Sequence, residues 1–517
     1  MTKPLSAVII GAGHNGLVCA IYLAKAGYQV QILEANQDVG GAAAAYEFAD
    51  GFQAPGLVNV PYGLNTKICK DLQLGSILQN AQSPMHSISL GEKGAHLTLT
   101  DNEVSGPKLS DEDVQAYQTF KEEFTRYAQA LQPLMINRPP RLKDMDRKDK
   151  FTLAKLGWSL RFGLGTESMR EFLRVGGINI YDVLNETFDN SQLKAAIAVD
   201  AVMGQHMGPR TPNTVLTYLQ RLWAQNEASP NLNTGLETLE ALKKAAKVAG
   251  VSIRINARVK RIKLENDAAV GVELESGEQV SAAVVVSNTA AKTTFLDLVG
   301  AKNLDAMFCH RVDNYRCKGN VAKVFYGVKG LPKFTGLSTE QLSQRLLVAP
   351  NLKYVEHAFN AVKYAEHSPQ PILEITLPSL QDSALAPKGH HIVSVSASFA
   401  PHTHKLGWDN QRKPFIKSIS SMIEHYAPGF GDSIEASELL TPADIEVQFN
   451  SAGGHWHQGE LSLDQSFMMR PVHGAAQYDT PIKGLYLCGA GTHPGGGITG
   501  VPGHNAAQRI LETGGQK

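Results

Sequence analysis

Three glycines near the start of the chain are the residues whose type and spacing most clearly predict chemistry. Gly11, Gly13 and Gly16 follow a short apolar run, and an apolar-periodic stretch continues from them to Gly27. In a strand, turn and helix unit the first glycine permits a tight turn and the second lets the backbone approach a pyrophosphate. The third lets the helix pack closely on the strand. Phosphate oxygens would then meet the free N–H groups of a helix N-terminus.

The residues after this turn complete a pocket for the ADP half of a dinucleotide. A second apolar run ends at Glu34, where a carboxylate can accept hydrogen bonds from a ribose diol. A further glycine pair, Gly40-Gly41, follows shortly afterwards. From this segment we predict the cofactor contacts Gly11, Ala12, Gly13, Asn15, Gly16, Glu34, Ala35, Gly40, Gly41 and Ala42.

The other end of the chain carries a second glycine-rich segment. Residues 489–503 follow a strand-like run and precede an apolar helix at residues 506–511. Glycines there allow backbone amides to lie against a flat ring or the chain attached to it. A separate dinucleotide site at this point is not expected, because too little sequence follows for another βαβ unit. We predict contacts with the same cofactor at Gly489, Gly491, Thr499 and Gly500.

These two segments carry a family resemblance. The Gly40-Gly41 pair after the ribose acid is similar to the extended fingerprint of glutathione-reductase-type FAD proteins, and residues 484–503 resemble the closing flavin segment of phytoene-desaturase-type enzymes. The whole chain resembles the branch called pyridine nucleotide-disulphide oxidoreductase domain-containing protein 2, and slightly less closely the carotenoid desaturases and flavin-type carotene ketolases. The resemblance implies FAD, with the backbone of Val259 at the adenine edge. Because the sequence has no obvious attachment motif, we expect the FAD to be bound noncovalently.

The resemblance also implies an α/β fold whose FAD domain is discontinuous in sequence and of the Rossmann-like, glutathione-reductase type. We assign residues 1–90, 235–300 and 441–517 to it, and residues 91–234 and 301–440 to an inserted α+β substrate domain. Local patterns agree: helical spacing at 236–246 is followed by strand alternation at 251–264, 270–274 and 279–286, read as one small antiparallel module. Ser110 is expected to cap a helix, residues 167–226 to be helical with a break at 204–212, and residues 321–328 and 391–397 to be strands.

A second complete glycine fingerprint for NADPH is missing between residues 42 and 488. We therefore expect an FAD-dependent oxidoreductase that removes hydride from a C–H bond of an organic, apolar substrate and passes the electrons to oxygen, a quinone or another external acceptor. Two alternatives stay open. One is a carotenoid desaturase, isomerase or ketolase acting on a membrane-derived polyene, for which a long apolar tunnel would speak. The other is a non-catalytic FAD-bound interaction protein.

Histidines supply the only candidates for acid–base chemistry in these segments. His493 is the histidine expected nearest the flavin, where an imidazole could accept a proton, although it could equally shape the turn before Pro494. His455 and His457 are two residues apart, but no spaced His or Cys ligands accompany them, so we expect no metal site.

Residues 151–164 are rich in large apolar side chains, with Lys155 and Arg161 as their only charges. The stretch fits a lipid interface that admits an apolar substrate. It also fits a core or lid helix of the substrate domain, or a dimer contact.

Composition narrows the class of protein. The 517 residues carry 49 basic and 49 acidic side chains, so global charge favours no nucleic-acid partner. Five cysteines without a Cys-x-x-Cys pair lack the dithiol of a disulphide reductase and suit a reducing compartment. We expect no signal peptide, because only about six residues precede the first predicted strand, and no membrane span, because no uncharged apolar run reaches roughly 18 residues. We expect a cytoplasmic protein, at most peripheral to a membrane, and make no prediction of its oligomeric state.

Overall fold

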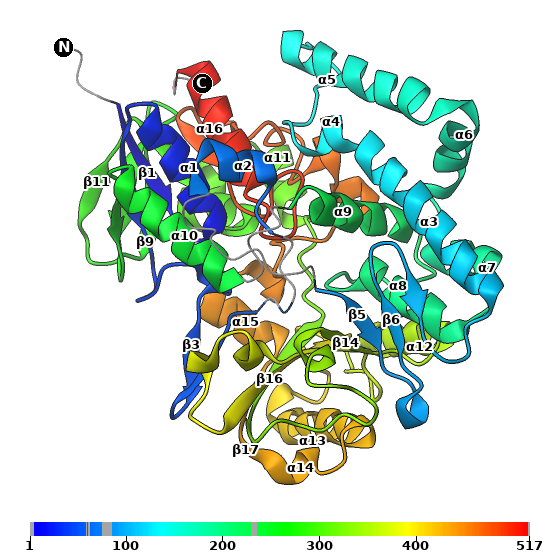
Figure 1. Cartoon of the computed structure of the whole chain (residues 1–517). Coiled ribbons are helices and arrows are strands. Elements are labelled where there is room, and N and C mark those ends of the chain that lie inside the picture. The colour runs from blue at the N-terminus through cyan, green and yellow to red at the C-terminus, as the bar shows by residue number, and fades with distance from the viewer. Residues whose placement is uncertain (1–4, 58, 60–62, 75–84, 229–234, 515–517) are drawn as a thin grey trace.

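Two sheets, with helices around and between them, organise the chain (Figure 1). This computed structural model describes residues 5–57, 59, 63–74, 85–228 and 235–514. In Figure 1 the first strand, β1, and the last helix, α16, lie together at one end, whereas β16 and β17 lie at the other. Residues from the two ends of the sequence therefore share one part of the molecule.

The first sheet has five parallel strands in the order β18-β12-β1-β2-β8. Their bounds are Ser6–Ile10 (β1), Gln29–Leu33 (β2), Ser252–Arg254 (β8), Val284–Ser287 (β12) and Leu485–Leu487 (β18). The central strands are buried, as expected for a parallel sheet covered on both faces. Helices α1 (His14–Lys25), α10 (Gly235–Val248) and α16 (Val501–Thr513) belong to this region.

The predicted antiparallel module is confirmed in part. Strands β9 (Val259–Glu265), β10 (Ala268–Leu274) and β11 (Gln279–Ser281) form an antiparallel sheet of three. Strand β8 was expected in the same module, but it pairs in parallel with β2 instead. The physical reason is that α10 precedes β8 and supplies the helical crossover that a parallel neighbour needs.

The second sheet has eight strands in the order β17-β13-β16-β15-β14-β5-β6-β7. Their bounds are Ser87–Ser89 (β5), Leu97–Leu99 (β6), Val104–Ser105 (β7), Val321–Lys329 (β13), Arg345–Val348 (β14), Leu373–Thr376 (β15), His390–Ser398 (β16) and Ile434–Leu440 (β17). Strand β5 comes from the stretch assigned above to the first FAD piece, but it pairs with β14 in this sheet. The division into domains otherwise stays a prediction.

The two faces of the eight-stranded sheet differ in polarity. On one face Val324, Val395 and Ile375 pack with the apolar side of α13 (Trp408–Tyr426). On the other face Lys323 pairs with Ser396, and Ser396 pairs with Glu374. These three polar side chains are buried as fully as the apolar ones. A buried polar face is costly unless its groups find partners, so its position matters for the site.

Helices cover the region between the sheets. Ser110 caps α3 (Asp111–Ala130) by accepting a 3.0 Å hydrogen bond from the Asp113 amide, as predicted. The predicted helical region with a break is confirmed by α6 (Gly165–Val175), α7 (Ile180–Thr187), α8 (Ser191–Val202) and α9 (Thr214–Asn226). The remaining elements are β3 (Tyr46–Ala49), β4 (Phe52–Ala54), α2 (Thr66–Asp71), α4 (Gln132–Met135), α5 (Arg147–Trp158), α11 (Ala306–Asp313), α12 (Leu352–Val362), α14 (Phe430–Ser433) and α15 (Pro442–Phe449).

Helix α5 and the π-helical turn Ser159–Gly163 form, with α6, an arm at the edge of the molecule (Figure 1). Phe151, Trp158 and Phe162 are 61%, 67% and 62% exposed. The interpretation of this stretch as a core helix is therefore wrong for these side chains, because no described element covers the face that carries them. Within the described residues, no helix is both long and apolar enough to span a bilayer.

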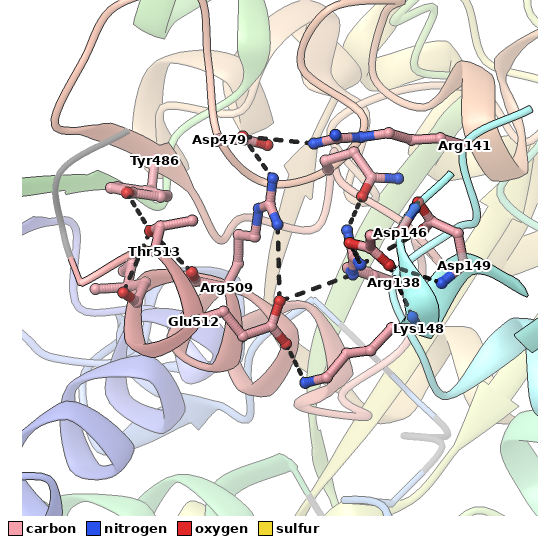
Figure 2. A network of polar contacts seen from close by, with 12 residues as sticks. Arg138, Arg141, Asp146, Lys148, Asp149, Asp479, Tyr486, Arg509, Glu512 and Thr513 are labelled. Carbon is pink, nitrogen blue, oxygen red and sulfur yellow. Dashed lines mark hydrogen bonds and ion pairs between the residues drawn. The ribbon is translucent and has the colours of Figure 1, made fainter. Parts of the chain in front are cut away.

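Ion pairs hold the base of this arm against α16 (Figure 2). The buried Arg138 guanidinium contacts Asp146, Asp149 and Glu512, and Glu512 also pairs with Lys148 and Arg509. Burial alone would raise the pKa of Asp146, but the Asp149 amide and Arg138 together lower it to about 2. The arm is thus joined to the C-terminal helix by electrostatic contacts, while its inward side, including Leu164 and Val175, packs against the main hydrophobic core.

Replacing Glu512 by Gln should loosen the base of the arm, because Arg138, Lys148 and Arg509 lose a shared carboxylate. We expect about 1 kcal/mol of lost stability and faster tryptic cleavage between residues 138 and 150. Glu171→Gln is the matched control, since its pair with Arg174 lies wholly on the exposed surface of α6. Equal cleavage rates in the two variants would contradict this account.

Candidate functional site

A cavity of about 580 Å³ lies between the carboxyl ends of β1 and β2 and the polar face of the eight-stranded sheet. Its volume falls within the roughly 300 to 1,000 Å³ of small-molecule sites. Ile10 and Leu33, the last residues of β1 and β2, line one end, and Glu374 of β15 lines the other. Ligands of open α/β sheets bind in such crevices beyond the strand ends.

The first glycine turn faces this cavity with unused hydrogen-bonding groups. Gly13 precedes α1 and supplies no side-chain cap, which leaves the first amides of the helix open. His14 Nε2 and Asn15 Oδ1 are buried without a hydrogen-bond partner, and both residues line the cavity. Glu34 lies beside them, where its carboxylate accepts hydrogen bonds from the amides of Ala12 (2.6 Å) and Asn36 (2.9 Å). These groups fit the phosphates and ribose of a dinucleotide.

Most of the N-terminal residues predicted to contact a cofactor lie on the cavity wall. The predicted residues that line it are Gly11, Gly13, Asn15, Glu34, Ala35, Gly40, Gly41, Ala42 and Val259. Ala12 and Gly16 lie just behind the wall. A Cβ on Gly16 would approach the Gly11 carbonyl oxygen to 2.4 Å, so this glycine serves close packing of the turn.

The C-terminal glycine segment also reaches the cavity, but through other residues than those predicted. The wall is formed by Ala490 and by Gly495 to Ile498, whereas Gly489, Gly491, Thr499 and Gly500 do not line it. Gly489 is packed against Gln458 and Asn288, and Gly500 against Leu64. His14 and Gly497 both line the cavity, so the two glycine segments meet at one site.

A fully buried arginine holds the C-terminal segment in place. Arg470 is 0% exposed and donates hydrogen bonds to backbone carbonyls alone. The acceptors lie on two segments and are the carbonyls of His457, Gly459, Glu460, Gln465, Ala490 and Thr492. No described carboxylate pairs with the guanidinium. It therefore acts as a fixed positive charge close to the Ala490 wall of the cavity.

Gln205 fixes the hydrogen-bonding state of His457 on the cavity wall. The Leu461 amide donates to Gln205 Oε1 (3.0 Å), so the Gln205 Nε2 group is left to donate to His457 Nδ1 (3.2 Å). Burial, helped by the charges of Arg470 and Arg221, lowers the pKa of His457 to about 3. A neutral imidazole with its proton on Nε2 is the result.

The structure gives His493, the catalytic candidate, a structural contact. Its Nε2 donates to the Leu134 carbonyl (2.9 Å), and burial lowers its pKa to about 4. It does not line the cavity, although the loop that carries it does. Among the described residues no group of three His, Cys, Asp or Glu side chains is arranged to hold a metal ion.

The inner end of the cavity lies under the polar sheet face, and none of the residues that line it was predicted from the sequence. It is lined by Asn59, Asp200, Thr217, Gln220, Arg221 and Glu374. The available signal was the alternation in residues 390–398, where Ser394, Ser396 and Ser398 interrupt a strand that is otherwise apolar. Such alternation in a strand with no exposed face places polar groups in the interior.

Lys323 lies immediately behind this inner end. It is 1% exposed and donates hydrogen bonds to Asn59 Oδ1 and to Ser396 Oγ (3.3 Å). Burial lowers its pKa from 10.5 to about 7, against a smaller opposing effect of Glu374. The cavity thus has an amine beside it that is close to its titration point near neutral pH.

The chain is similar to known proteins over almost its full length. Residues 9–71 match the family described as NAD(P)-binding Rossmann-like domain. The chain is 32% identical to the Mus musculus pyridine nucleotide-disulfide oxidoreductase domain-containing protein 2, over 98% of this chain and 93% of that protein. It belongs to the pyridine nucleotide-disulfide oxidoreductase domain-containing protein 2 family. A phytoene desaturase of Cereibacter sphaeroides is 26% identical over 96% of this chain and 92% of its own.

Solved structures confirm the fold class. A putrescine oxidase bound to putrescine has a TM-score of 0.60 at 14% identity and covers 99% of each chain. An oxidoreductase of Methanosarcina mazei has a TM-score of 0.58 at 17% identity, over 98% of this chain and 100% of that one. Together the relatives and the Rossmann-like domain confirm the predicted class, an FAD-dependent oxidoreductase.

Replacing Arg470 by Met should destabilise the protein by about 3 to 5 kcal/mol, because several buried carbonyls lose their donor together. Arg254→Met, which removes an exposed pair with Glu278, is the control and should cost about 1 kcal/mol or less. Denaturant unfolding of both variants measures the difference. Equal losses of unfolding free energy in the two variants would show that the buried hydrogen bonds of Arg470 stabilise the protein no more than an exposed ion pair.

Lys323 should make stability depend on pH. Its pKa is lower in the folded chain than in the unfolded one, so between pH 7 and 10.5 the unfolded chain binds more protons and stability rises with pH. The contribution of this one group has a slope of about 1.4 kcal/mol per pH unit. In Lys323→Met this slope should disappear from unfolding curves recorded across that range. An unchanged dependence of stability on pH would show that a group other than Lys323 titrates in this range.

Proposed function

We propose that this protein binds FAD noncovalently across the cavity and uses it to remove hydride from a C–H bond of an organic substrate. The observation that carries the proposal is the meeting of two glycine segments, from opposite ends of the sequence, at one cavity with unpartnered polar atoms in its wall. A shared cavity of this kind suits a ligand with a phosphate-rich half and a flat half.

Each part of the wall has a role in this proposal. The α1 amides and the Gly40-Gly41 turn would hold the pyrophosphate, and Glu34 the ribose. The backbone of Val259 would contact the adenine, and Gly495 to Ile498 the flavin ring. When bound, FAD supplies a hydride acceptor that can pass its electrons on.

The chain's own groups would orient the substrate and manage charge. Gln205 holds His457 as a neutral donor at Nε2, and Arg470 keeps a positive charge beside the C-terminal wall. Lys323, with a pKa near 7, can hold or release a proton at Nζ behind Asn59. Burial of this wall excludes water from the reacting centre.

The electron acceptor in this proposal is external, either oxygen or a quinone, because the sequence has no second glycine fingerprint for a nicotinamide. The polar inner end argues against a polyene that is hydrocarbon throughout. The exposed Phe151, Trp158 and Phe162, with Lys155 and Arg161 between them, support contact of the arm with a lipid surface that holds the apolar part of a substrate.

Gly13→Val should abolish retention of the cofactor while leaving the fold intact. The added side chain projects beside the cavity, where its nearest neighbour, Asn288 Nδ2, is the movable end of a side chain. Gly157→Val is the control, since a Cβ there meets nothing within 4 Å. We expect yellow wild-type and Gly157→Val proteins and colourless Gly13→Val protein after purification.

The same wild-type protein tests the reaction. Under anaerobic conditions an organic donor should bleach the flavin absorbance, and oxygen or a quinone should restore it. A folded wild-type protein that is colourless and refuses added FAD would end the proposal. A yellow protein that no donor in a broad screen bleaches would favour the non-catalytic alternative.

A further inference from the structure

The inner end of the cavity contains a cluster of charged side chains from three structural layers. Asp200 of α8 lies 3.0 Å from Arg221 of α9 and 2.7 Å from Arg345 of β14. Arg345 also contacts Glu374 of β15 at 2.6 Å. Asp200, Arg221 and Glu374 line the cavity, and Arg345 joins the two carboxylates from below. The cluster is therefore a wall of the cavity and not only a link between elements.

The described charges at this end do not balance. Three basic side chains, Arg221, Arg345 and Lys323, face two carboxylates, Asp200 and Glu374. Burial alone would raise the pKa of Asp200, but Arg221 and Arg345 lower it. Burial lowers the pKa of Lys121, while the charges of Asp101 and Asp200 raise it and that of Arg221 lowers it, so these groups also act on the cluster. Glu438 lies further along the sheet face, where it accepts the hydroxyl hydrogen of Tyr46. With Lys323 protonated, the inner end carries one positive charge in excess.

A buried polar group points to a ligand at the same place. Gln220 is 8% exposed and lines the cavity, and its buried Oε1 has no hydrogen-bond partner among the described residues. An unsatisfied buried amide oxygen is costly. Rotated by about 180° around its last side-chain bond, the Gln220 amide would present its Nε2 donor to an acceptor such as a carboxylate. Burial of three cations with two carboxylates is costly for the same reason, and an anion supplied by a ligand would offset it.

The wall changes character between this end and the C-terminal glycine segment. The intervening lining contains Met135, Met203, Trp223, Leu461 and Ile498. A ligand that reaches from the glycine segment to the charged cluster would therefore place an apolar body along these side chains and a polar group at the cluster.

We propose that the substrate is an organic acid with an apolar body, and that Arg221 and Gln220 bind its carboxylate while the charge of Lys323 supports them from behind Asn59. This inference rests on the function proposed above, since it names the substrate class of the same cavity. Its evidence is separate, because none of the residues proposed to hold FAD belongs to the charged cluster. Neutral and cationic compounds of the same length should bind less well.

Calorimetric titration of the purified, cofactor-loaded protein tests the inference with three probes of equal chain length: octanoate, octanol and octylamine. We expect octanoate to bind at least tenfold more tightly than octanol, and octylamine to bind more weakly than both. Arg221→Gln and Gln220→Leu should each reduce the preference for octanoate over octanol at least fivefold. Arg412→Gln, which removes an ion pair with Asp444 outside the cavity lining, is the control and should leave the preference unchanged.

Retention of FAD by each variant reports an intact fold independently of the probes. If the variants keep FAD and the preference for octanoate, or if octanol or octylamine binds as tightly as octanoate to the wild type, the inference is wrong while the proposed function stands. If the wild type binds octanoate with the expected preference but holds no flavin, the proposed function fails and the acid site remains.

Discussion

The buried guanidinium of Arg470 is the interaction on which the cavity most depends. Segments around residues 457–465 and 490–492 have little regular secondary structure, so their carbonyls cannot be satisfied by a helix or sheet ladder. One planar cation with five N–H donors satisfies carbonyls from both segments at once. The geometry of the Ala490 wall and the position of the His457 backbone follow from this arrangement, because both belong to the segments that Arg470 joins.

The eight-stranded sheet buries polar side chains on one of its faces, in the protein interior, where apolar side chains are usual. Its outer face packs on α13 with apolar side chains, and its inner face presents Glu374 to the cavity, with Lys323 and Ser396 behind the wall. Burying ionisable groups in this way is a weak source of stability. The buried polar groups instead suit a binding surface. This surface is rigid because the groups project from paired strands and not from loops.

The parallel sheet explains why the site is assembled from distant pieces of sequence. Strands from the start, the middle and the end of the chain are neighbours in the order β18-β12-β1-β2-β8, so their carboxyl ends converge on one edge. The helices that enter and leave that edge bring the Gly11 turn against Gly497. The arm is different in kind: it projects from the body, is held at its base by ion pairs, and leaves its aromatic side chains uncovered.

The strand, turn and helix near the start of the chain and the helix capped by Ser110 could be predicted from sequence, because each depends on residues close together. The family resemblance could be recognised because it rests on long local matches. The local βαβ pattern also singled out Glu34 and Gly13, which line the cavity. The folded structure was needed to show which C-terminal glycines reach the cavity and that His493 hydrogen-bonds the carbonyl of Leu134. It was also needed to show that Asp200, Arg221 and Glu374 lie on one wall. Those outcomes depend on contacts between segments separated by many residues, for which periodicity and spacing carry no information.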